Sequence, residues 1–301
     1  MKVPAGFDVG VCSHTGSVRG NNEDDYFVGT APDGVFLCAI ADGMGGVAGG
    51  AEASRTALWA LGMAVLDGST KLPHEERVRE GFAAASVRLF DAANAVPALR
   101  DMGTTLTALC FGDGMARLGH VGDTRAYRLR GGVCEQLTTD HAVREPSNML
   151  LRCIGGGHAT CDVDQAEWRT EPGDRFLLVT DGVWSVVPGP LLQRLAERSK
   201  PQAVAEALVA QALAAGGPDN ATAVVVDVLE ASDLSANREV DLPRDERPSD
   251  RDRWPKPVSL RPPVWPWVLL TVALLWLVHA VLRWAFGIDG SGWLLDWLRG
   301  R

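Results

Sequence analysis

The residues with the clearest chemical potential in this 301-residue chain are aspartates that follow apolar segments. Asp42-Gly43 comes after the run VFLCAIA and Asp181-Gly182 after FLLVT, and neither pair leads directly into a returning strand. A carboxylate at the end of a buried strand needs a compensating partner, because burial removes its water. The other four Asp-Gly pairs suit turns or helix ends, since Asp accepts local backbone hydrogen bonds and Gly adopts positive φ. Asp33-Gly34 and Asp113-Gly114 lie between β runs, whereas Asp67-Gly68 and Asp289-Gly290 follow helical stretches.

Three further acidic loops add to these two aspartates. They contain Asn22-Glu23-Asp24, Asp123 and Asp219-Asn220. Clustered carboxylates without neighbouring His or Cys suit hard cations such as Mg²⁺ or Mn²⁺, which prefer oxygen ligands and keep several waters. The five loops together predict a divalent-cation site.

The elements that must position these loops can be read from hydrophobic periodicity. Helical spacing of apolar residues predicts helix pairs at 49–67 and 74–95 and again near 189–199 and 201–215, before a last strand at 222–229. Short β-rich segments separated by Gly and Asp turns lie between the pairs, at 104–111, 114–121, 124–129, 133–138, 160–169 and 175–180. This order predicts an α+β fold with mostly antiparallel sheets and helical layers outside.

Charge and cysteine content exclude several classes of function. The formal net charge is −9, with the acidic excess in residues 1–230, which argues against nucleic-acid binding. The six Cys are spread singly, without the CxxC pairs of a zinc site, and indicate reduced thiols in a cytosolic domain. The N-terminus lacks the apolar region of a signal peptide.

The C-terminal part of the chain differs in composition. Residues 231–263 are rich in Pro and charge, which predicts a linker. Twenty-one residues without a charged side chain separate Arg261 from Arg283, enough to cross a ~30 Å hydrocarbon core, so we expect a transmembrane helix at 264–286. A buried core helix and an interfacial helix are the alternatives. The end, 287–301, resembles a short amphipathic membrane-surface segment.

Basic residues flanking the predicted span set its orientation. Five precede it (Arg247, Arg251, Arg253, Lys256, Arg261) and three follow it (Arg283, Arg299, Arg301). By the positive-inside rule we expect a single-pass protein of the cell membrane with the catalytic domain in the cytoplasm.

Seven motifs in order resemble the metal-dependent Ser/Thr protein phosphatases of the 2C (PPM) family, over nearly all of residues 6–230. They are Val18-Arg19 with Asn22-Glu23-Asp24, Ala41-Asp42-Gly43-Met44-Gly45-Gly46, Asp101-Met102-Gly103-Thr104-Thr105, His120 to Arg125, Thr138-Thr139-Asp140-His141, Thr180-Asp181-Gly182 and Gly217-Pro218-Asp219-Asn220. The Asp-Gly-Met-Gly-Gly form resembles the bacterial branch. The resemblance implies a phosphatase domain at 1–230 with four layers, two antiparallel sheets with a helix pair on each outer face.

The resemblance also implies a role for each matching residue. Asp42 would bridge two Mn²⁺ or Mg²⁺ ions, which would be held further by the carbonyl of Gly43 and by Asp24, Asp181 and Asp219. Glu23 would act behind these ligands or through a water. Asp123, together with Asp181, would recruit a third, weaker cation. Arg19 would bind the substrate phosphate, which its planar guanidinium suits.

The implied activity is that of a protein serine/threonine phosphatase. A water activated by two metals would hydrolyse phosphoserine and phosphothreonine. Its partners would be phosphoprotein substrates and a cognate Ser/Thr kinase that it opposes at the membrane. The alternatives are a non-catalytic phosphoprotein-binding scaffold, which the presence of every metal carboxylate disfavours, and a metal phosphohydrolase acting on small molecules.

The chain departs from the family pattern at two places. Met44 stands where animal members carry a proton-donating His, so a metal-bound water is the simpler acid. We expect a turn-capping or packing role for His141, with an acid role as the alternative, a structural role for His120 and exposure for His158. Twelve residues separate His141 from Ile154, where bacterial members have a helical flap, so the flap must be nearly absent.

Overall fold

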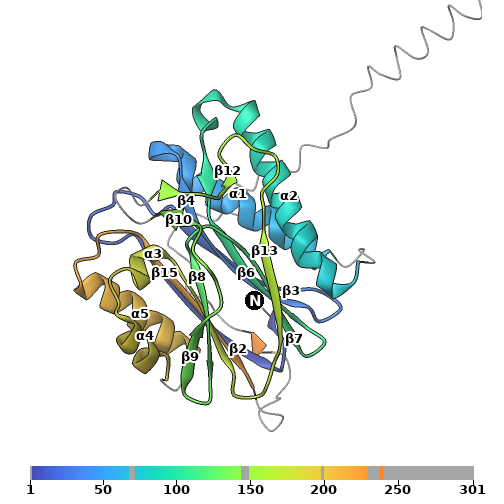
Figure 1. Ribbon diagram of the computed structural model, residues 1–301, viewed down its shortest axis with the longest axis vertical. Coiled ribbons are helices and arrows are strands. Elements are labelled where there is room, and N and C mark those ends of the chain that lie inside the picture. Colours follow the sequence, from blue (N-terminus) through green and yellow to red (C-terminus); the bar gives the residue numbers. More distant parts are fainter. Residues whose placement is uncertain (1, 68–71, 144–148, 198–199, 230–237, 240–301) are drawn as a thin grey trace, which may run out of the picture. The chain divides into compact units, whose positions relative to one another are not determined.

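The computed structural model describes residues 2–67, 72–143, 149–197, 200–229 and 238–239 (Figure 1). The chain divides into two units, Met1–Asp245 and Glu246–Arg301. The second unit, with the predicted span 264–286 and tail 287–301, lies outside the described residues. Among the helices that are described, none has both the length and the apolar character needed to cross a membrane.

The first sheet has seven strands in the order β12-β5-β4-β6-β7-β13, with β3 also paired to β4. Its strands are β3 (Asp24–Thr30), β4 (Phe36–Met44), β5 (Gly103–Thr104), β6 (Leu106–Gly112), β7 (Met115–Val121), β12 (Ile154–Gly155) and β13 (Asp164–Arg169). All of its pairings are antiparallel. The Asp33-Gly34 and Asp113-Gly114 turns join β3 to β4 and β6 to β7, as predicted, and Asp113 has a positive φ of 53°.

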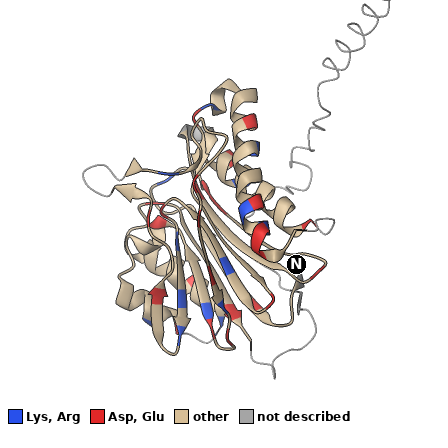
Figure 2. Ribbon diagram, turned by 45° about the vertical axis from the view of Figure 1, so that its right-hand side comes forward, with Lys and Arg blue, Asp and Glu red and all other residues tan. Residues whose placement is uncertain are grey.

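The second sheet has five antiparallel strands in the order β2-β15-β14-β8-β9. These are β2 (Phe7–His14), β8 (Arg125–Arg130), β9 (Val133–Gln136), β14 (Arg175–Val179) and β15 (Ala221–Val228). Ion pairs connect its strands and loops, among them Arg128 with Glu135 and Arg130 with Asp174. Basic and acidic segments accordingly lie next to one another on the ribbon (Figure 2).

Helices cover the outer face of each sheet. Helices α1 (Gly46–Leu66) and α2 (His74–Ala95) pack on the first sheet, and α4 (Gly189–Ala196) and α5 (Pro201–Ala214) on the second (Figure 1). The short elements η1 (Pro97–Leu99) and α3 (Asp181–Trp184) complete the helical set among the described residues. The predicted four-layer α+β architecture is confirmed.

Alternation along β4 shows how the sequence builds these layers. Phe36, Cys38 and Ile40 belong to the apolar core between the two sheets, whereas Leu37, Ala39 and Ala41 belong to the core under α1 and α2. A strand whose two faces are both covered is apolar at every position, because successive side chains point to opposite faces. The run VFLCAIA therefore marks a central strand.

Two short strand pairs lie outside the sheets. β1 (Lys2–Val3) pairs with β16 (Arg238–Glu239), so two residues of the predicted linker 231–263 are a strand. β10 (Ala142–Val143) pairs with β11 (Met149–Leu150), in the segment between His141 and Ile154. The described part of that segment is a small hairpin where bacterial relatives are expected to have a helical flap.

Candidate metal centre

Asp24 and Asp42 are directly opposite one another in the β3–β4 ladder. Opposed residues of an antiparallel pair project from the same face, so the two carboxylates face the same space. The sequence predicted that Asp42 follows its strand, but β4 continues to Met44 and Asp42 lies within it. This extension of β4 gives Asp42 its register with Asp24.

Asp24 is 1% exposed and is held by two hydroxyl groups. Thr180 and Thr222 each donate a hydrogen bond to its Oδ2, at 2.8 and 2.7 Å. Its Oδ1 is buried and has no hydrogen-bond partner among the described residues. Burial raises the pKa of Asp24 to about 7, assisted by the charges of Asp181 and Asp219 and opposed by the two threonine hydrogen bonds.

The backbone around Asp42 is fixed by the Thr104-Thr105 pair. The Asp42 amide donates to Thr105 Oγ1 at 2.9 Å, and the Asp42 carbonyl accepts from Thr105 N and Thr104 Oγ1, each at 2.9 Å. Burial raises the pKa of Asp42 well above its usual range. The same pKa is raised further by four other aspartates, Asp24, Asp181, Asp123 and Asp219. The predicted acidic loops are thus brought together around Asp42.

Asp181 opens helix α3, two residues after the last residue of β14. Burial raises its pKa to about 6, and Asp123 and Asp219 push that pKa in the same direction. A side-chain hydrogen bond with Asp42 lowers it. The raised pKa means that the ionised form of Asp181 is disfavoured unless positive charge lies nearby.

The loops that carry these carboxylates lie in close backbone contact and are connected by the side chain of Asn220. A Cβ at Gly182 would lie 1.9 Å from the carbonyl oxygen of Asn220, and one at Gly43 would lie 2.0 Å from that of Gly50. The Asn220 side chain accepts from Glu23 N at 2.8 Å and donates to the carbonyls of two residues in the loop before β3, Thr15 and Asn21. Asn220 thereby binds the Asp219 loop to the Glu23 loop.

Arg19, the predicted phosphate ligand, is paired with a predicted metal ligand. Its Nη2 donates to Asp219 Oδ2 at 2.8 Å, and the side chains are 55% and 32% exposed. This hydrogen bond, reinforced by the negative charge of Asp219, raises the pKa of Arg19. Glu23 is affected by the charges of both Arg19 and Asp219. Burial raises the pKa of Glu23, the charge of Arg19 lowers this pKa and the charge of Asp219 raises it.

The two histidines of the motifs have structural partners. His141 accepts from Gly122 N at 3.2 Å through Nδ1, and its Nε2 lies 3.0 Å from Asp164 Oδ2, so both ring nitrogens are engaged. His120 is fully buried, with its ring nitrogens on Thr107 Oγ1 at 2.8 Å and on the Thr139 carbonyl at 3.1 Å. These contacts agree with the structural roles expected for both, and His158 is exposed as predicted.

Polar atoms at the cluster fit a divalent cation. Within the described part of the chain, no three His, Cys, Asp or Glu side chains converge closely enough to hold a metal ion by themselves. However, Oδ1 of Asp24 and Oδ1 of Asp181 are both buried, and no described residue gives either oxygen a hydrogen bond. Mg²⁺ and Mn²⁺ suit such oxygens, since they use few direct carboxylates and complete their coordination with water.

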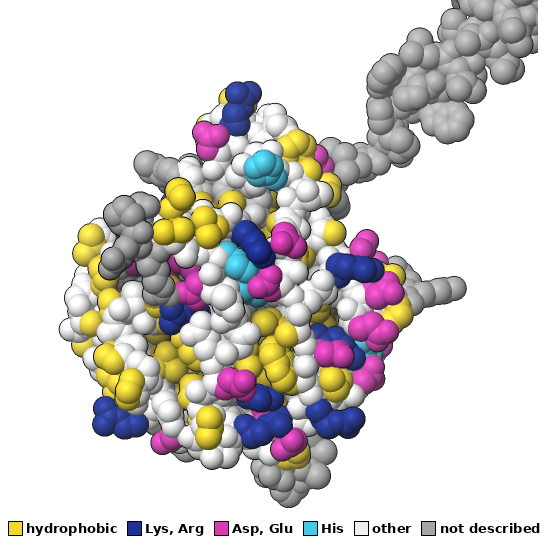
Figure 3. Space-filling model, viewed as in Figure 1, with side chains coloured by type: hydrophobic (Ala, Val, Ile, Leu, Met, Phe, Trp, Pro, Cys, Tyr) yellow, Lys and Arg dark blue, Asp and Glu magenta, His cyan; other side chains and the backbone are white. Residues whose placement is uncertain are grey.

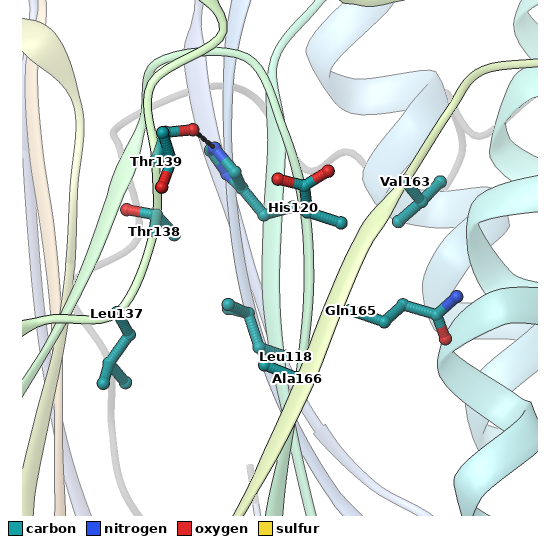
Figure 4. Close-up of a pocket in the computed structure, with 9 residues that line it drawn as sticks. Leu118, His120, Leu137, Thr138, Thr139, Val163, Gln165 and Ala166 are labelled. Atoms are coloured by element: carbon teal, nitrogen blue, oxygen red, sulfur yellow. Dashed lines mark hydrogen bonds between the residues drawn. The ribbon is translucent and has the colours of Figure 1, made fainter.

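A separate pocket of about 400 Å³ lies between β7 and β13 on one side and the segment after β9 on the other. His120, Leu118 and Leu137 reach into it, with the His120 ring bonded to the Thr139 carbonyl (Figure 4). In the space-filling view, acidic, basic and His side chains gather near the middle of this face, above a hollow with hydrophobic lining (Figure 3). The aspartate cluster does not line this pocket.

Several site residues were missed from sequence. Thr180 and Thr222 bind Asp24, and the Trp184 indole donates to the Asp123 carbonyl at 3.0 Å. The two threonines belong to the junctions at the ends of β14 and β15, and only the sheet pairing brings them to Asp24. The position of Trp184, three residues after Asp181, was a signal that could have been used.

Comparison with known proteins shows which family this chain resembles. A family model described as protein phosphatase 2C matches residues 14–230. The chain is similar to the serine/threonine protein phosphatase PstP of Mycobacterium tuberculosis, 34% identical over 240 residues that cover 72% of this chain and 44% of PstP. It thus spans less than half the length of PstP. It is also similar to the protein phosphatase PhpP of Streptococcus pneumoniae, 31% identical over 249 residues covering 74% of this chain and 98% of PhpP.

The fold of the chain is also similar to that of a solved phosphatase structure. The catalytic domain of PstP in complex with two manganese ions matches with a TM-score of 0.67 at 31% identity. The match covers 74% of this chain and 99% of that one.

Proposed function

The chain belongs to the protein phosphatase 2C family, and we propose that it is a protein serine/threonine phosphatase that hydrolyses phosphoserine and phosphothreonine in proteins. The observation that carries this proposal is the pairing of Asp24 with Asp42 in one ladder, beside buried Oδ1 atoms of Asp24 and Asp181 that have no hydrogen-bond partner among the described residues. The manganese-bound structure of the PstP catalytic domain supports the same reading.

Two Mn²⁺ or Mg²⁺ ions would be held by Asp42, the Gly43 carbonyl, Asp24, Asp181 and Asp219. When bound, such ions supply Lewis-acid chemistry and lower the pKa of water so that it becomes a nucleophile at neutral pH. Asp123 and Asp181 would share a third, weaker cation. Glu23 would act from behind the direct ligands, where its amide is held by Asn220.

The protein's own residues would orient the reaction. Thr180 and Thr222 hold Asp24 through Oδ2, which leaves Oδ1 available. The guanidinium of Arg19 would bind the phosphate group by donating hydrogen bonds to two phosphate oxygens. Its present pairing with Asp219 places it beside the carboxylate cluster. His141 would position the Gly122 backbone and is not proposed as an acid, because both of its ring nitrogens are engaged.

The assay of this proposal is phosphate release from phosphothreonine and phosphoserine peptides by the full-length protein, with Mn²⁺ or with EDTA. We expect activity with Mn²⁺ that EDTA abolishes, and loss of activity in Asp42→Ala and Asp181→Ala. Asp162→Ala, at an aspartate whose side chain is 83% exposed, is the matched control and should retain full activity. Asp123→Ala should keep part of the activity, since its cation is peripheral.

Each rival function predicts a different result. Hydrolysis that persists in EDTA would contradict the two-metal mechanism. Absence of hydrolysis in every divalent metal would favour a phosphoprotein-binding scaffold. Faster hydrolysis of small phosphate esters than of phosphopeptides would favour a small-molecule phosphohydrolase.

We also propose that segment 264–286 anchors the phosphatase domain on the cytoplasmic side of the cell membrane, opposite a membrane-associated Ser/Thr kinase. The charge-free stretch between Arg261 and Arg283 and the basic residues before it support this arrangement. Fractionation of cells that express the full-length chain tests it. Recovery of the protein wholly in the soluble fraction at ordinary salt would refute the anchor.

A further inference from the structure

The loop that carries Asp123 is held on both sides by two consecutive residues. On one side, His141 N donates to the Gly122 carbonyl at 2.7 Å and Gly122 N donates to the His141 ring at 3.2 Å. On the other side, Asp140 accepts two hydrogen bonds from Arg125, from Nε and Nη2, each at 3.0 Å. The Asp140-His141 dipeptide therefore fixes the residues that flank Asp123 and its neighbour Thr124.

Trp184 completes this arrangement from a different element. Its indole Nε1 donates to the Asp123 carbonyl at 3.0 Å. The Arg125 guanidinium carbon lies 3.7 Å from the centroid of the indole ring, close enough for a strong cation–π contact. The indole is thus held by Arg125, which Asp140 holds in turn.

The position of Trp184 connects Asp123 to a second carboxylate. Trp184 is the last residue of α3, the helix that Asp181 begins, and its own amide donates to the Thr180 carbonyl at 3.2 Å. The indole hydrogen bond therefore ties the Asp123 loop to the helical turn that carries Asp181. These two carboxylates also interact electrostatically.

The affinity for a cation shared by two carboxylates depends on the distance between the two carboxylates. Metal–ligand distances must fall within about 0.2 Å of ideal values, and partners that orient the ligands commonly affect affinity by about 10–100-fold. A group that bonds the backbone of one ligand while belonging to the turn of the other is placed to control that separation.

We propose that Trp184 is a positioning residue that keeps Asp123 at a fixed distance from Asp181. The indole, held by Arg125, thereby sets the affinity for the third, weaker divalent cation. This inference rests on the proposed function, because that function assigns the cation to Asp123 and Asp181. A role in packing alone would require the ring and not its N–H group.

Trp184→Phe separates the two roles, since it keeps an aromatic ring and removes the hydrogen bond to Asp123. Trp59→Phe is the matched control: Trp59 lies on α1, contacts Arg88 in a cation–π pair at 5.7 Å and is remote in sequence from the aspartate loops. Calorimetric titration of the metal-free, full-length proteins with Mn²⁺ measures each class of site directly. Mn²⁺ dependence of peptide hydrolysis gives a second readout.

We expect Trp184→Phe to weaken the weakest Mn²⁺ site about fivefold, which corresponds to the loss of one hydrogen bond of about 1 kcal/mol. The tight sites should be unchanged, and the Mn²⁺ concentration for half-maximal activity should rise by a similar factor while kcat at saturating Mn²⁺ is kept. Trp59→Phe should match the wild type in every measurement.

Three results would overturn the proposal. The Trp184→Phe isotherm could be identical to that of the wild type, or the variant could bind Mn²⁺ more weakly at every site and melt at a lower temperature. The third such result is a wild-type isotherm that shows no weaker site. If Trp184→Phe does not fold, Arg125→Lys decides, because Lys keeps the charge beside Asp140 but loses the planar stack and the paired hydrogen bonds. A wild type that binds Mn²⁺ without hydrolysing peptides refutes the proposed function, whereas a selective loss of the weak site in the variant still supports the positioning role.

Discussion

Asp24 and Asp42 are paired residues of one antiparallel ladder, and their carboxylates share a face of the sheet. Like charges directly opposite one another destabilise a strand pair. Here burial adds to the repulsion and raises the pKa of both groups. The fold thus maintains an arrangement that is unfavourable for the protein alone and becomes favourable when protons or cations supply positive charge.

This relationship predicts that Mn²⁺ binding depends on pH. Without metal, the pKa of Asp24 is about 7 and that of Asp181 about 6, above the ordinary Asp value of ~4 in the unfolded chain. Their contribution to stability is therefore present below pH ~4 and is lost as the pH rises through 6 and 7. Mn²⁺ must displace these protons, so its affinity should fall by more than about tenfold from pH 7.5 to pH 5.5.

The measurement is the rise in melting temperature on adding Mn²⁺ to metal-free protein at the two pH values. We expect a larger rise at pH 7.5 than at pH 5.5. Asp24→Asn should reduce the difference between the two, and Asp162→Asn should not. Equal rises at both pH values would show that these carboxylates are already ionised without metal.

Thr222 should contribute to both stability and metal affinity. It is fully buried, and its hydroxyl donates to Asp24 Oδ2 at 2.7 Å. Thr222→Val keeps the shape but removes the donor, and a hydrogen bond to a charged group is worth about 1.5–3 kcal/mol. We expect a loss of that size in the free energy of unfolding, measured by urea denaturation in Mn²⁺, and a higher Mn²⁺ requirement for activity.

Thr222→Ser is the matched control, because it restores the hydroxyl at the cost of one methyl group. It should recover most of the metal affinity. A valine variant with wild-type Mn²⁺ dependence would mean that the hydroxyl does not orient Asp24.

Sequence periodicity predicted the helices and strands well where an element has one exposed face. The predicted helix 74–95 coincides with α2, whose apolar positions recur along one side. Strand β2 (Phe7–His14) was not anticipated, because its polar residues and Gly10 interrupt the pattern. The reason lies in tertiary packing: a Cβ at Gly10 would come 2.1 Å from the backbone nitrogen of Gln202, where α5 crosses the strand.

The site shows the same division between what is local and what is tertiary. Asp42 and Asp181 could be found because each follows an apolar run in the sequence. The hydroxyl groups that hold Asp24 could not, since Thr180 and Thr222 are 156 and 198 residues away from it in the chain. Ordinary threonines at strand ends carry no signal of this role until the β14–β15 pairing is known.

The close contact at Gly182 predicts a large effect from a single methyl group. A Cβ there would lie 1.9 Å from the Asn220 carbonyl oxygen, a backbone atom that cannot rotate away. Gly182→Ala must therefore separate the Asp181 turn from the Asp219 loop, and overpacking of this kind costs about 1–3 kcal/mol. We expect that loss in urea denaturation together with a strong reduction in activity.

Gly189→Ala provides the comparison, since a Cβ at Gly189, at the start of α4, would meet no atom of the described residues within 4 Å. It should change stability by less than about 0.5 kcal/mol and leave activity intact. If both alanine variants behave alike, the approach of Gly182 to Asn220 is not required for the site.

His120 should make the protein sensitive to mild acid. Burial, with a contribution from the charge of His141, lowers the pKa of His120 to about 4, although the hydrogen bond to Thr139 and the charge of Asp164 oppose this. The unfolded chain has a His pKa of ~6.5, so the unfolded state takes up a proton first as the pH falls. Stability from this group is therefore complete above pH ~6.5 and is lost progressively down to pH 4, by about 2 kcal/mol at pH 5.

His120→Gln isolates this contribution, because Gln can still donate a hydrogen bond to the Thr139 carbonyl but does not titrate. The wild type should be more stable than the variant at pH 7.5, and urea denaturation should show that advantage shrinking by about 2 kcal/mol at pH 5. The carboxylates of the metal site titrate equally in both proteins and cancel in the difference. An advantage that stays constant between the two pH values would mean that His120 becomes protonated without unfolding, with the ring reorganising between Thr107 and Thr139.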